Sequence, residues 1–455
     1  MNPLWHFTPT PFMLFCVLLL AACAQKNQTY SVGLETLPHS WSTQTDTAQQ
    51  QTGPWLEVFD SPGINALVEL ALSKNYRLAQ QAALLEIAEQ RVITSGAELL
   101  PSLDFRANGQ RQKRTGSIDE QFGLNLSVSY ELDIWGKLSN RQKQGQLNFS
   151  SQQASYLQSQ RNLAAEVINA SFSASSAAQL LELLEQRLVN LEQSLDVIQR
   201  GYRSGLNESL DVYLSQSTLE QQRANVANQL QIKFESLTRL ELLVASYPGA
   251  RLKISSELPD LPTMPATGLP SHLIQLRPDI QQAWLDLLAA DAGVAIAHKE
   301  RFPSLTLSGN LNDSSTNFGE LLGAGPLGWT LGASILQPLF QGGRLKALEQ
   351  QAKFQLRLQE KNYLDVVYRA FAEVENTLHL ETVLEQRYGA ILRAESLAEA
   401  ALSLAFAQYQ RGLVNYTTVL ESQRRAFDAQ TTVIQLKSQR LQNRVKLSLA
   451  LGGAY

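Results

Sequence analysis

Apolar and polar residues alternate strictly in four short segments of this chain. From Phe122 to Ile134 every even-numbered residue is apolar and every odd-numbered residue is small or polar. The same alternation recurs in segments 103–108, 305–312 and 329–335. A period of two predicts strands with one apolar and one polar face. For any one segment, a soluble antiparallel sheet with one buried face is a competing interpretation.

A second pattern, with apolar residues three, four or seven positions apart, fills the regions between the strands. The leucines from Leu180 to Leu195 follow the first spacing, and Leu420, Phe427, Ile434 and Leu441 follow the second. Segment 139–200 contains no proline and a single glycine, Gly145. It therefore predicts a helix about 90 Å long, which needs neighbouring helices to cover its apolar seam.

The chain repeats itself at a spacing of roughly 207 residues. Tyr202-Arg203-Ser204-Gly205-Leu206 matches Tyr409-Gln410-Arg411-Gly412-Leu413, and Gly136-Lys137-Leu138 matches Gly343-Arg344-Leu345. Such self-similarity predicts that each half contains the same elements. We expect a first repeat at 61–245 (helix, β-hairpin, long helix, helix), a Pro-rich linker at 246–270 and a second repeat at 271–455.

Four strands are too few to form a closed barrel in a membrane. An open sheet edge in lipid leaves N–H and C=O groups unpaired, at a cost of several kcal/mol each. The smallest transmembrane barrels have about eight strands, and water-filled ones have more. The chain is therefore expected to share a barrel with copies of itself. The strand pattern alone allows either three or four copies.

The N-terminus predicts a secreted, lipid-anchored protein. The apolar run from Phe12 to Ala22 has the length of a signal peptide and ends in Leu20-Ala21-Ala22-Cys23. This order resembles the bacterial lipobox, so segment 1–22 is expected to be removed and Cys23 to carry acyl chains. Ala24 follows in place of the Asp that retains lipoproteins at the inner membrane, which favours the outer membrane. Segment 23–60 is polar and is expected to be extended.

Composition argues against several other functions. The net charge is −4 and no run of like charges occurs, so nucleic acid is not an expected partner. The two cysteines, Cys16 and Cys23, lie in the first 25 residues, and the five histidines are scattered. We therefore expect no metal site, no cofactor and no catalytic constellation, and we interpret the protein as a non-enzyme.

Several motifs, by their order and duplication, resemble the outer-membrane efflux factors, the TolC-like duct proteins, and in particular the NodT-type lipoprotein branch that serves RND multidrug pumps. They run from the signal peptide to the last helix: Leu20-Ala21-Ala22-Cys23, Leu100-Pro101-Ser102-Leu103, Tyr130-Glu131-Leu132-Asp133-Ile134-Trp135-Gly136-Lys137-Leu138, Tyr202-Arg203-Ser204-Gly205, Leu210-Asp211-Val212, Leu276-Arg277-Pro278-Asp279-Ile280, Pro338-Leu339-Phe340-Gln341-Gly342-Gly343-Arg344 and Tyr409-Gln410-Arg411-Gly412.

The resemblance implies a mixed α and β fold: an internally duplicated protomer of a homotrimer, with a 12-stranded transmembrane β-barrel continuous with a long periplasmic α-helical barrel. It implies an equatorial region built from the chain ends and the linker. It also implies a periplasmic gate, whose acidic and basic residues fall on Glu421 and Arg424, with Asp211 as a further candidate. Glu421 stands where the family usually has Asp. A solvated surface pair is the alternative for Glu421 and Arg424.

The resemblance further implies partners. A periplasmic membrane-fusion adaptor would contact the turns containing Tyr202, Arg203, Gly205, Tyr409, Arg411 and Gly412, and an RND-type inner-membrane pump would drive export. The expected function is therefore a passive efflux channel for drugs or other small molecules in the outer membrane, extending into the periplasm. A protein-secretion duct and a non-channel coiled-coil lipoprotein scaffold are the alternatives.

Overall fold

The computed structural model describes residues 40–42, 62–265, 270–321, 323 and 327–453. The chain divides into a unit at 1–36 and a unit at 37–455, and every described residue belongs to the second. The expected signal peptide and Cys23 lie outside the described residues.

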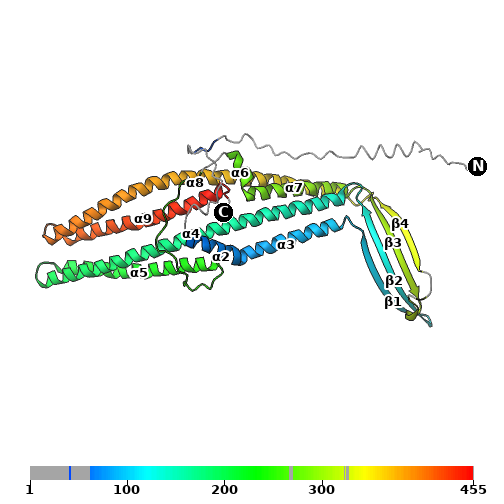
Figure 1. The fold of residues 1–455 in the computed structure, drawn as a ribbon, viewed down its shortest axis with the longest axis horizontal. Coiled ribbons are helices and arrows are strands. Elements are labelled where there is room, and N and C mark those ends of the chain that lie inside the picture. Colours follow the sequence, from blue (N-terminus) through cyan, green and yellow to red (C-terminus); the bar gives the residue numbers. More distant parts are fainter. Residues whose placement is uncertain (1–39, 43–61, 266–269, 322, 324–326, 454–455) are drawn as a thin grey trace, which may run out of the picture. The chain divides into compact units, whose positions relative to one another are not determined.

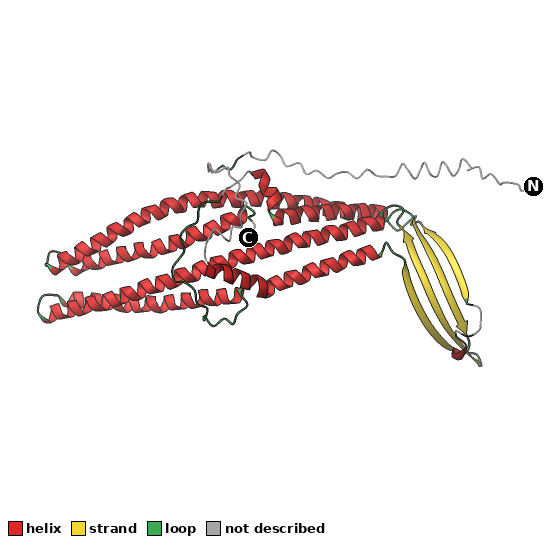
Figure 2. Ribbon diagram, in the orientation of Figure 1, coloured by secondary structure: helices red, strands yellow, loops and turns green. Residues whose placement is uncertain are grey.

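The alternating segments form a single antiparallel sheet in the order β1-β2-β3-β4. Its strands are β1 (Ser102–Arg114), β2 (Ser117–Leu132), β3 (Ser304–Ser315) and β4 (Gly328–Leu336). The central β2–β3 pairing joins the two halves of the chain (Figure 1). Figure 2 shows the strands together as one sheet beyond the ends of the helices. Strand β2 ends two residues before Ile134, because the following residue, Asp133, instead caps the next helix.

The register of the strands keeps apolar and polar side chains on opposite faces of the sheet. Leu126 lies opposite Phe105 on one side and Leu311 on the other, while Ser127 lies opposite Asp104 and Asn310. Nothing in the described chain covers the apolar face at β4, where Trp329, Leu331 and Ile335 are each more than 70% exposed. The sheet therefore has an unpartnered apolar face and two unpaired edges, at β1 and β4.

Each half also contains two long helices. Helices α4 (Lys137–Arg203) and α8 (Arg344–Gln410) have 67 residues each, and α5 (Ser209–Leu243) and α9 (Tyr416–Ala450) have 35. A 67-residue helix is about 100 Å long. Equivalent helices begin 207 residues apart, so the sequence repeat is also a structural one. None of the described helices combines the length and apolar character needed to cross a bilayer.

The long helices pair as two hairpins that lie side by side (Figure 1). Helix α4 packs on α5, α8 packs on α9, and α4 also contacts α9. Near the sheet, α3 (Tyr76–Ala97) packs on α4, and α7 (Pro278–Lys299) packs on both α4 and α8. Because each long helix follows a strand and ends in a turn, the hairpin turns lie a full helix length away from the strands.

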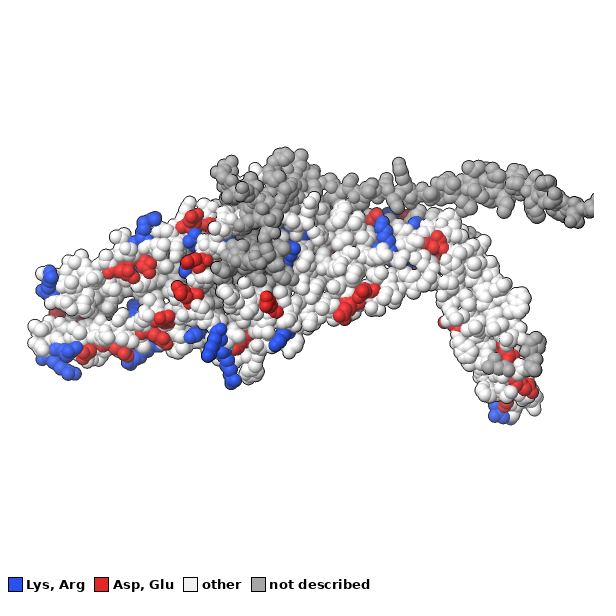
Figure 3. Space-filling view, in the orientation of Figure 1, with Lys and Arg blue, Asp and Glu red and all other residues white. Residues whose placement is uncertain are grey.

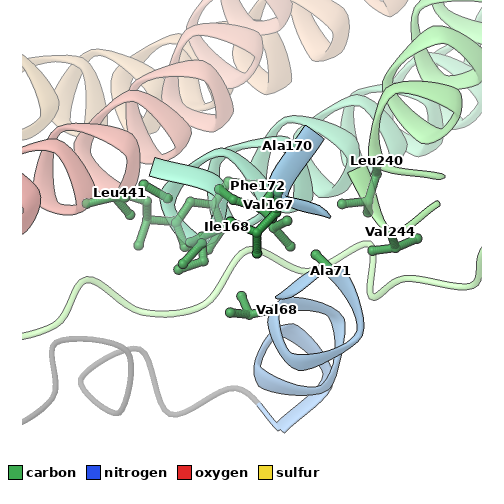
Figure 4. Packing of buried hydrophobic residues seen from close by; sticks show 14 of the residues in the cluster. Val68, Ala71, Val167, Ile168, Ala170, Phe172, Leu240, Val244 and Leu441 are labelled. Carbon is green, nitrogen blue, oxygen red and sulfur yellow. The ribbon is translucent and has the colours of Figure 1, made fainter. Parts of the chain in front are cut away.

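The main hydrophobic core surrounds the middle of α4. Helix α2 (Pro62–Lys74) places Val68 and Ala71 against Val167 and Ile168, and all four side chains are fully buried (Figure 4). Leu258 of the linker also packs into this core. Burying one large aliphatic side chain contributes about 1.5–3 kcal/mol, so this cluster fixes α2 and the linker on α4.

The linker at 246–265 has no regular secondary structure, but its backbone is bound to the helices. The Glu241 carboxylate accepts N–H groups from Ala250, Arg251 and Leu252 at 2.6–3.0 Å. From α9, Lys437 donates to the carbonyl of Leu258 and Arg444 to that of Pro262. After the linker, helix α6 (Pro270–Leu276) leads into α7.

Candidate functional site

The two hairpin turns have the same backbone geometry. In the first, the N–H of Leu206 donates to the Gly201 carbonyl at 2.8 Å and that of Gly205 to the Tyr202 carbonyl at 3.0 Å. In the second, Leu413 and Gly412 donate to the carbonyls of Gln408 and Tyr409 at 3.0 and 2.8 Å. This is the Schellman end of a helix, which needs a left-handed residue. Gly205 and Gly412 supply it, both with φ of 73°.

The turn residues named from the sequence differ in exposure. Tyr202, Arg203, Gly205, Arg411 and Gly412 are all exposed. Tyr409 is half-buried, because its ring turns toward the other hairpin. The residue after each glycine is a strongly exposed leucine, with Leu206 81% and Leu413 69% exposed. Neither leucine was predicted to be a contact residue, although each lies directly after a turn glycine.

A contact between the two hairpins lies just inside these turns. The Tyr409 hydroxyl on α8 donates to Oδ2 of Asp211 on α5 at 3.4 Å. The Tyr409 ring packs on that of Tyr416, the first residue of α9, with the centroids 5.4 Å apart. Tyr416 is buried in a cluster that includes Ile198 of α4 and Val419 of α9. All four long helices therefore contribute to one contact region.

Burial and the neighbouring charge of Asp211 raise the pKa of Tyr409 to about 12. The phenol therefore keeps its proton throughout the physiological range and remains a donor to the Asp211 carboxylate. A donor and an acceptor on different hairpins form a link that can be made or broken as the hairpins move. The long 3.4 Å separation indicates a weak hydrogen bond.

Glu421 and Arg424 lie together on α9 and form an ion pair. Two guanidinium nitrogens of Arg424 donate to the two carboxylate oxygens at 2.9 and 3.1 Å. Arg425 adds a third bond to Glu421 at 2.8 Å, and Arg424 also reaches Asp428 at 3.1 Å. Side-chain exposure is 45% for Glu421 and 60% for Arg424. Such a pair adds little to stability.

Hydrogen bonds from Arg424 and Arg425 lower the pKa of Glu421 to about 2. The cluster therefore keeps its charges at any physiological pH. Within the described chain no hydrogen bond or ion pair joins Asp211 to this cluster, so the three expected gate residues form two separate groups. Arg425 and Asp428 were missed, although each lies four positions from a named residue, the spacing at which helix side chains meet.

The four charges of this cluster have no counterparts at the equivalent positions of the first repeat, whose own ion pairs join Arg223 to Glu220 and Glu192. At the corresponding positions, 207 residues earlier, α5 has Leu214, Ser217, Thr218 and Gln221. Helices α5 and α9 nevertheless have the same length and the same turn geometry. The charges on α9 are therefore not required to form a hairpin, which favours a role for them beyond folding.

A groove of about 630 Å³ lies next to this cluster, between α4, α8 and α9. Arg187 of α4 spans it, with its guanidinium 3.9 Å from the centroid of the Phe427 ring on α9. This cation–π contact is a second link between the hairpins. It could not be read from the sequence, because Arg187 and Phe427 belong to different repeats.

Charge is distributed differently over the helices and the sheet. On the face seen in Figure 3, acidic and basic side chains occur along the helices and at the turns, whereas most of the sheet has neither. Among the described residues, no group of three or more His, Cys, Asp or Glu side chains is placed to hold a metal ion.

Strands with an apolar face and helices long enough to form a tunnel define a channel subunit of the outer-membrane class. The sequence model of the family described as "Outer membrane efflux protein" matches residues 67–245 and 269–453. The chain belongs to this family.

Named relatives and a solved structure agree with this assignment. The chain is 30% identical to the pyoverdine export outer membrane protein OpmQ of Pseudomonas aeruginosa, covering 96% of this chain and 95% of that one. It is 28% identical to the probable outer membrane lipoprotein SilC of Salmonella typhimurium, covering 96% and 97%. A crystal structure of CusC superposes with a TM-score of 0.85 at 25% identity, covering 93% of this chain and 99% of CusC.

These findings confirm the expected family, the mixed α and β fold, the outer-membrane location and the function as an outer-membrane efflux channel. The domain boundaries and the roles of individual residues remain predictions.

Proposed function

We propose that this protein is the passive outer-membrane duct of a tripartite efflux system, and that three copies form it. The unpaired edges at β1 and β4 and the exposed apolar face of the sheet support the sharing of a barrel. Three four-stranded sheets give twelve strands, enough for a water-filled lumen. The polar face, rich in Asn, Ser and Thr, would line that lumen, and the apolar face would contact lipid.

The helical hairpins would continue this lumen into the periplasm and close it at their tips. The link between Asp211 and Tyr409 holds the two hairpins of one chain together. The cluster of Glu421 and Arg424 occurs only on α9 and is not needed for the hairpin itself. We assign the first contact to holding the hairpins closed and the second to a charged ring at the constriction.

The turns would be the docking surface for a periplasmic adaptor, which couples the duct to an inner-membrane RND-type pump. Tyr202, Arg203 and Arg411 are exposed there, next to Leu206 and Leu413. Tyrosine and arginine are enriched among interface hot spots, and the exposed leucines add apolar area beside them. The Schellman geometry of Gly205 and Gly412 fixes the direction in which these side chains point.

The cargo class follows from the relatives by analogy. OpmQ is named for pyoverdine export and CusC for cation efflux. We propose small molecules, including drugs, as the cargo of this chain, with selection by the pump. We also propose that Cys23 is lipidated, because its setting matches a lipobox and SilC is a named lipoprotein. Palmitate incorporation that is lost in Cys23→Ala tests this.

Single-channel recording in planar bilayers tests the duct and its gate together. The purified oligomer should conduct rarely, whereas Asp211→Asn and Tyr409→Phe should each open more often, because each weakens the link between hairpins. Tyr202→Phe is the matched control: it removes a hydroxyl at the equivalent position of the first repeat, where the side chain is exposed. Equal behaviour of Tyr202→Phe and Tyr409→Phe would overturn the gate, and an oligomer that never conducts would overturn the duct.

A further inference from the structure

The short described segment at 40–42 is attached to α8. The Trp41 side chain is only 6% exposed, and its ring meets that of Phe371 edge-on, with the centroids 6.2 Å apart. Tyr368, three residues before Phe371, packs edge-on against the Phe371 ring at 6.4 Å and is itself 56% exposed. The backbone N–H of Ser42 donates to Oε1 of Glu375 at 2.8 Å.

The α8 residues in this contact form a built site. Tyr368, Phe371 and Glu375 are three and four positions apart, so they lie on one side of the helix. The Phe371 ring contacts the indole, Tyr368 packs on Phe371, and the Glu375 carboxylate accepts the N–H of the next residue, Ser42. Tryptophan contributes more apolar area than other side chains, so its burial gives a strong, specific attachment.

In the first repeat the equivalent face of α4 is covered in a different way. The residues 207 positions earlier on α4 are Arg161, Ala164 and Ile168. Ala164 and Ile168 are completely buried in the core that includes α2. On α4 a helix of the chain covers this face, whereas on α8 the equivalent positions hold Tyr368, Phe371 and Glu375, of which Phe371 contacts Trp41 and Glu375 binds Ser42.

The distance along the chain between Cys23 and Trp41 suits an attachment of the N-terminal segment to the helices. Cys23 precedes Trp41 by 18 residues. Such a length of chain reaches at most about 60 Å. Along α8, Phe371 lies 27 residues from Arg344, where the helix begins after β4. That distance is about 40 Å. The 18 residues are therefore long enough to span this part of α8.

We propose that Trp41 is a clip that binds the N-terminal segment to its own α8, at Phe371 and Glu375, and so sets how far the lipid-bearing end can extend. The tether role rests on the proposed lipidation of Cys23. The clip itself does not, because its contacts lie entirely in the protein. Its ligand is the segment Trp41-Ser42 of the same chain.

Thiol cross-linking in the outer membrane tests the clip, because the chain has no cysteine after Cys23. Ser42→Cys with Glu375→Cys should be joined within one chain by a short thiol-specific cross-linker. Ser42→Cys with Arg369→Cys is the control, since Arg369 is exposed and lies about 100° around the helix from Tyr368. Adding Trp41→Ala should lower the yield of the first pair at least about tenfold, whereas Trp41→Phe should retain part of it.

Three results would overturn the clip: an equal yield from the control pair, no effect of Trp41→Ala, or cross-links mainly between chains. Palmitate labelling and channel conductance are measured on the same variants. Normal labelling and conductance with no cross-link would refute the clip and leave the duct standing. A cross-link without labelling would leave the clip standing and refute the lipid tether.

Discussion

The two repeats have the same helices at the same spacing, yet they bury different kinds of side chain between their paired helices. In the second repeat Arg444 of α9 and Glu381 of α8 form a buried ion pair at 2.5 Å, with side chains only 5% and 7% exposed. The corresponding positions of the first repeat hold Leu237 and Ala174, which are buried as well. One backbone arrangement thus tolerates either an apolar pair or an ion pair.

This difference shows which features belong to the fold and which were added to one half. The elements common to both repeats, such as the long helices and the glycine turns, need only apolar seams and a left-handed residue. Polar side chains found in only one repeat make hydrogen bonds that the other repeat lacks. Arg444 also donates to the Pro262 carbonyl of the linker, and Glu381 also accepts from Asn443.

The largest expected effect comes from breaking this ion pair. Glu381→Ala or Arg444→Leu alone leaves a buried charge without its partner, and each should lower the free energy of unfolding by about 3–5 kcal/mol. The double variant has the residues of the first repeat. It should lose only about 2 kcal/mol, for the hydrogen bonds to Pro262 and from Asn443. Denaturant unfolding of all four proteins measures the coupling, and additive single effects would contradict the equivalence of the repeats.

The next largest effect concerns Glu349, which joins α8 to the end of α7. Its carboxylate binds Lys353 at 2.7 Å, Arg301 at 2.6 Å and His298 at 3.3 Å, and the equivalent residue in the first repeat is Gln142. Glu349→Gln keeps the shape but removes the charge, and should lower the free energy of unfolding by about 1–3 kcal/mol. Gln142→Ala is the control and should have a smaller effect.

Glu349 also predicts a pH dependence of stability. Hydrogen bonding from Lys353, with that from Arg301 and His298, lowers the pKa of Glu349 from 4.5 to about 2. A carboxylate whose pKa is lower in the folded state stabilises the protein at pH values above its pKa in the unfolded state. That stabilisation is lost as the pH falls toward the pKa in the folded state. The difference in stability between the natural protein and Glu349→Gln should therefore persist from pH 8 to 5 and shrink below about pH 4.5. A difference that shrinks between pH 8 and 6 would contradict this assignment.

A smaller effect is expected at the start of the long helices. The Asp133 carboxylate accepts the N–H groups of Leu138 and Ser139 at 2.8 Å and so caps α4. Although burial raises the pKa of Asp133, these bonds and that from the Ser139 hydroxyl lower it overall. The equivalent residue before α8 is Phe340, which cannot cap. Asp133→Ala should cost about 1 kcal/mol, measured by thermal unfolding, and Phe340→Ala should leave the helix end unchanged.

The smallest expected effect is the response of the α9 cluster to pH. Because the pKa of Glu421 is about 2, its pairing with Arg424 should be unaffected between pH 8 and 5. Channel opening in Glu421→Gln and in the natural protein should therefore show the same pH profile in this range. A gate that opens on acidification only when Glu421 is present would contradict the assignment of a permanently charged cluster.

Local patterns predicted the fold, because strands and helices follow from periodicity. The alternation from Phe122 onward identified β2, and Gly205 and Gly412 identified the turns. Contacts between distant segments could not be predicted in the same way. The partners Tyr409 and Asp211 are 198 positions apart, and a buried pair such as Arg444 and Glu381 looks like surface charge in a sequence. Trp41 gave no signal at all, since its site is formed by α8.

The central claim is that the free edges of one sheet pair with those of neighbouring copies to complete a shared barrel. Single cysteines at Asn108 on β1 and at Thr330, Gly332 or Ser334 on β4 place thiols on the polar face of both edges. Oxidation of the outer-membrane protein carrying one such pair should give disulfide-linked dimers and trimers and nothing larger. Exclusively monomeric protein for every pair, or a ladder that extends beyond the trimer, would contradict the account.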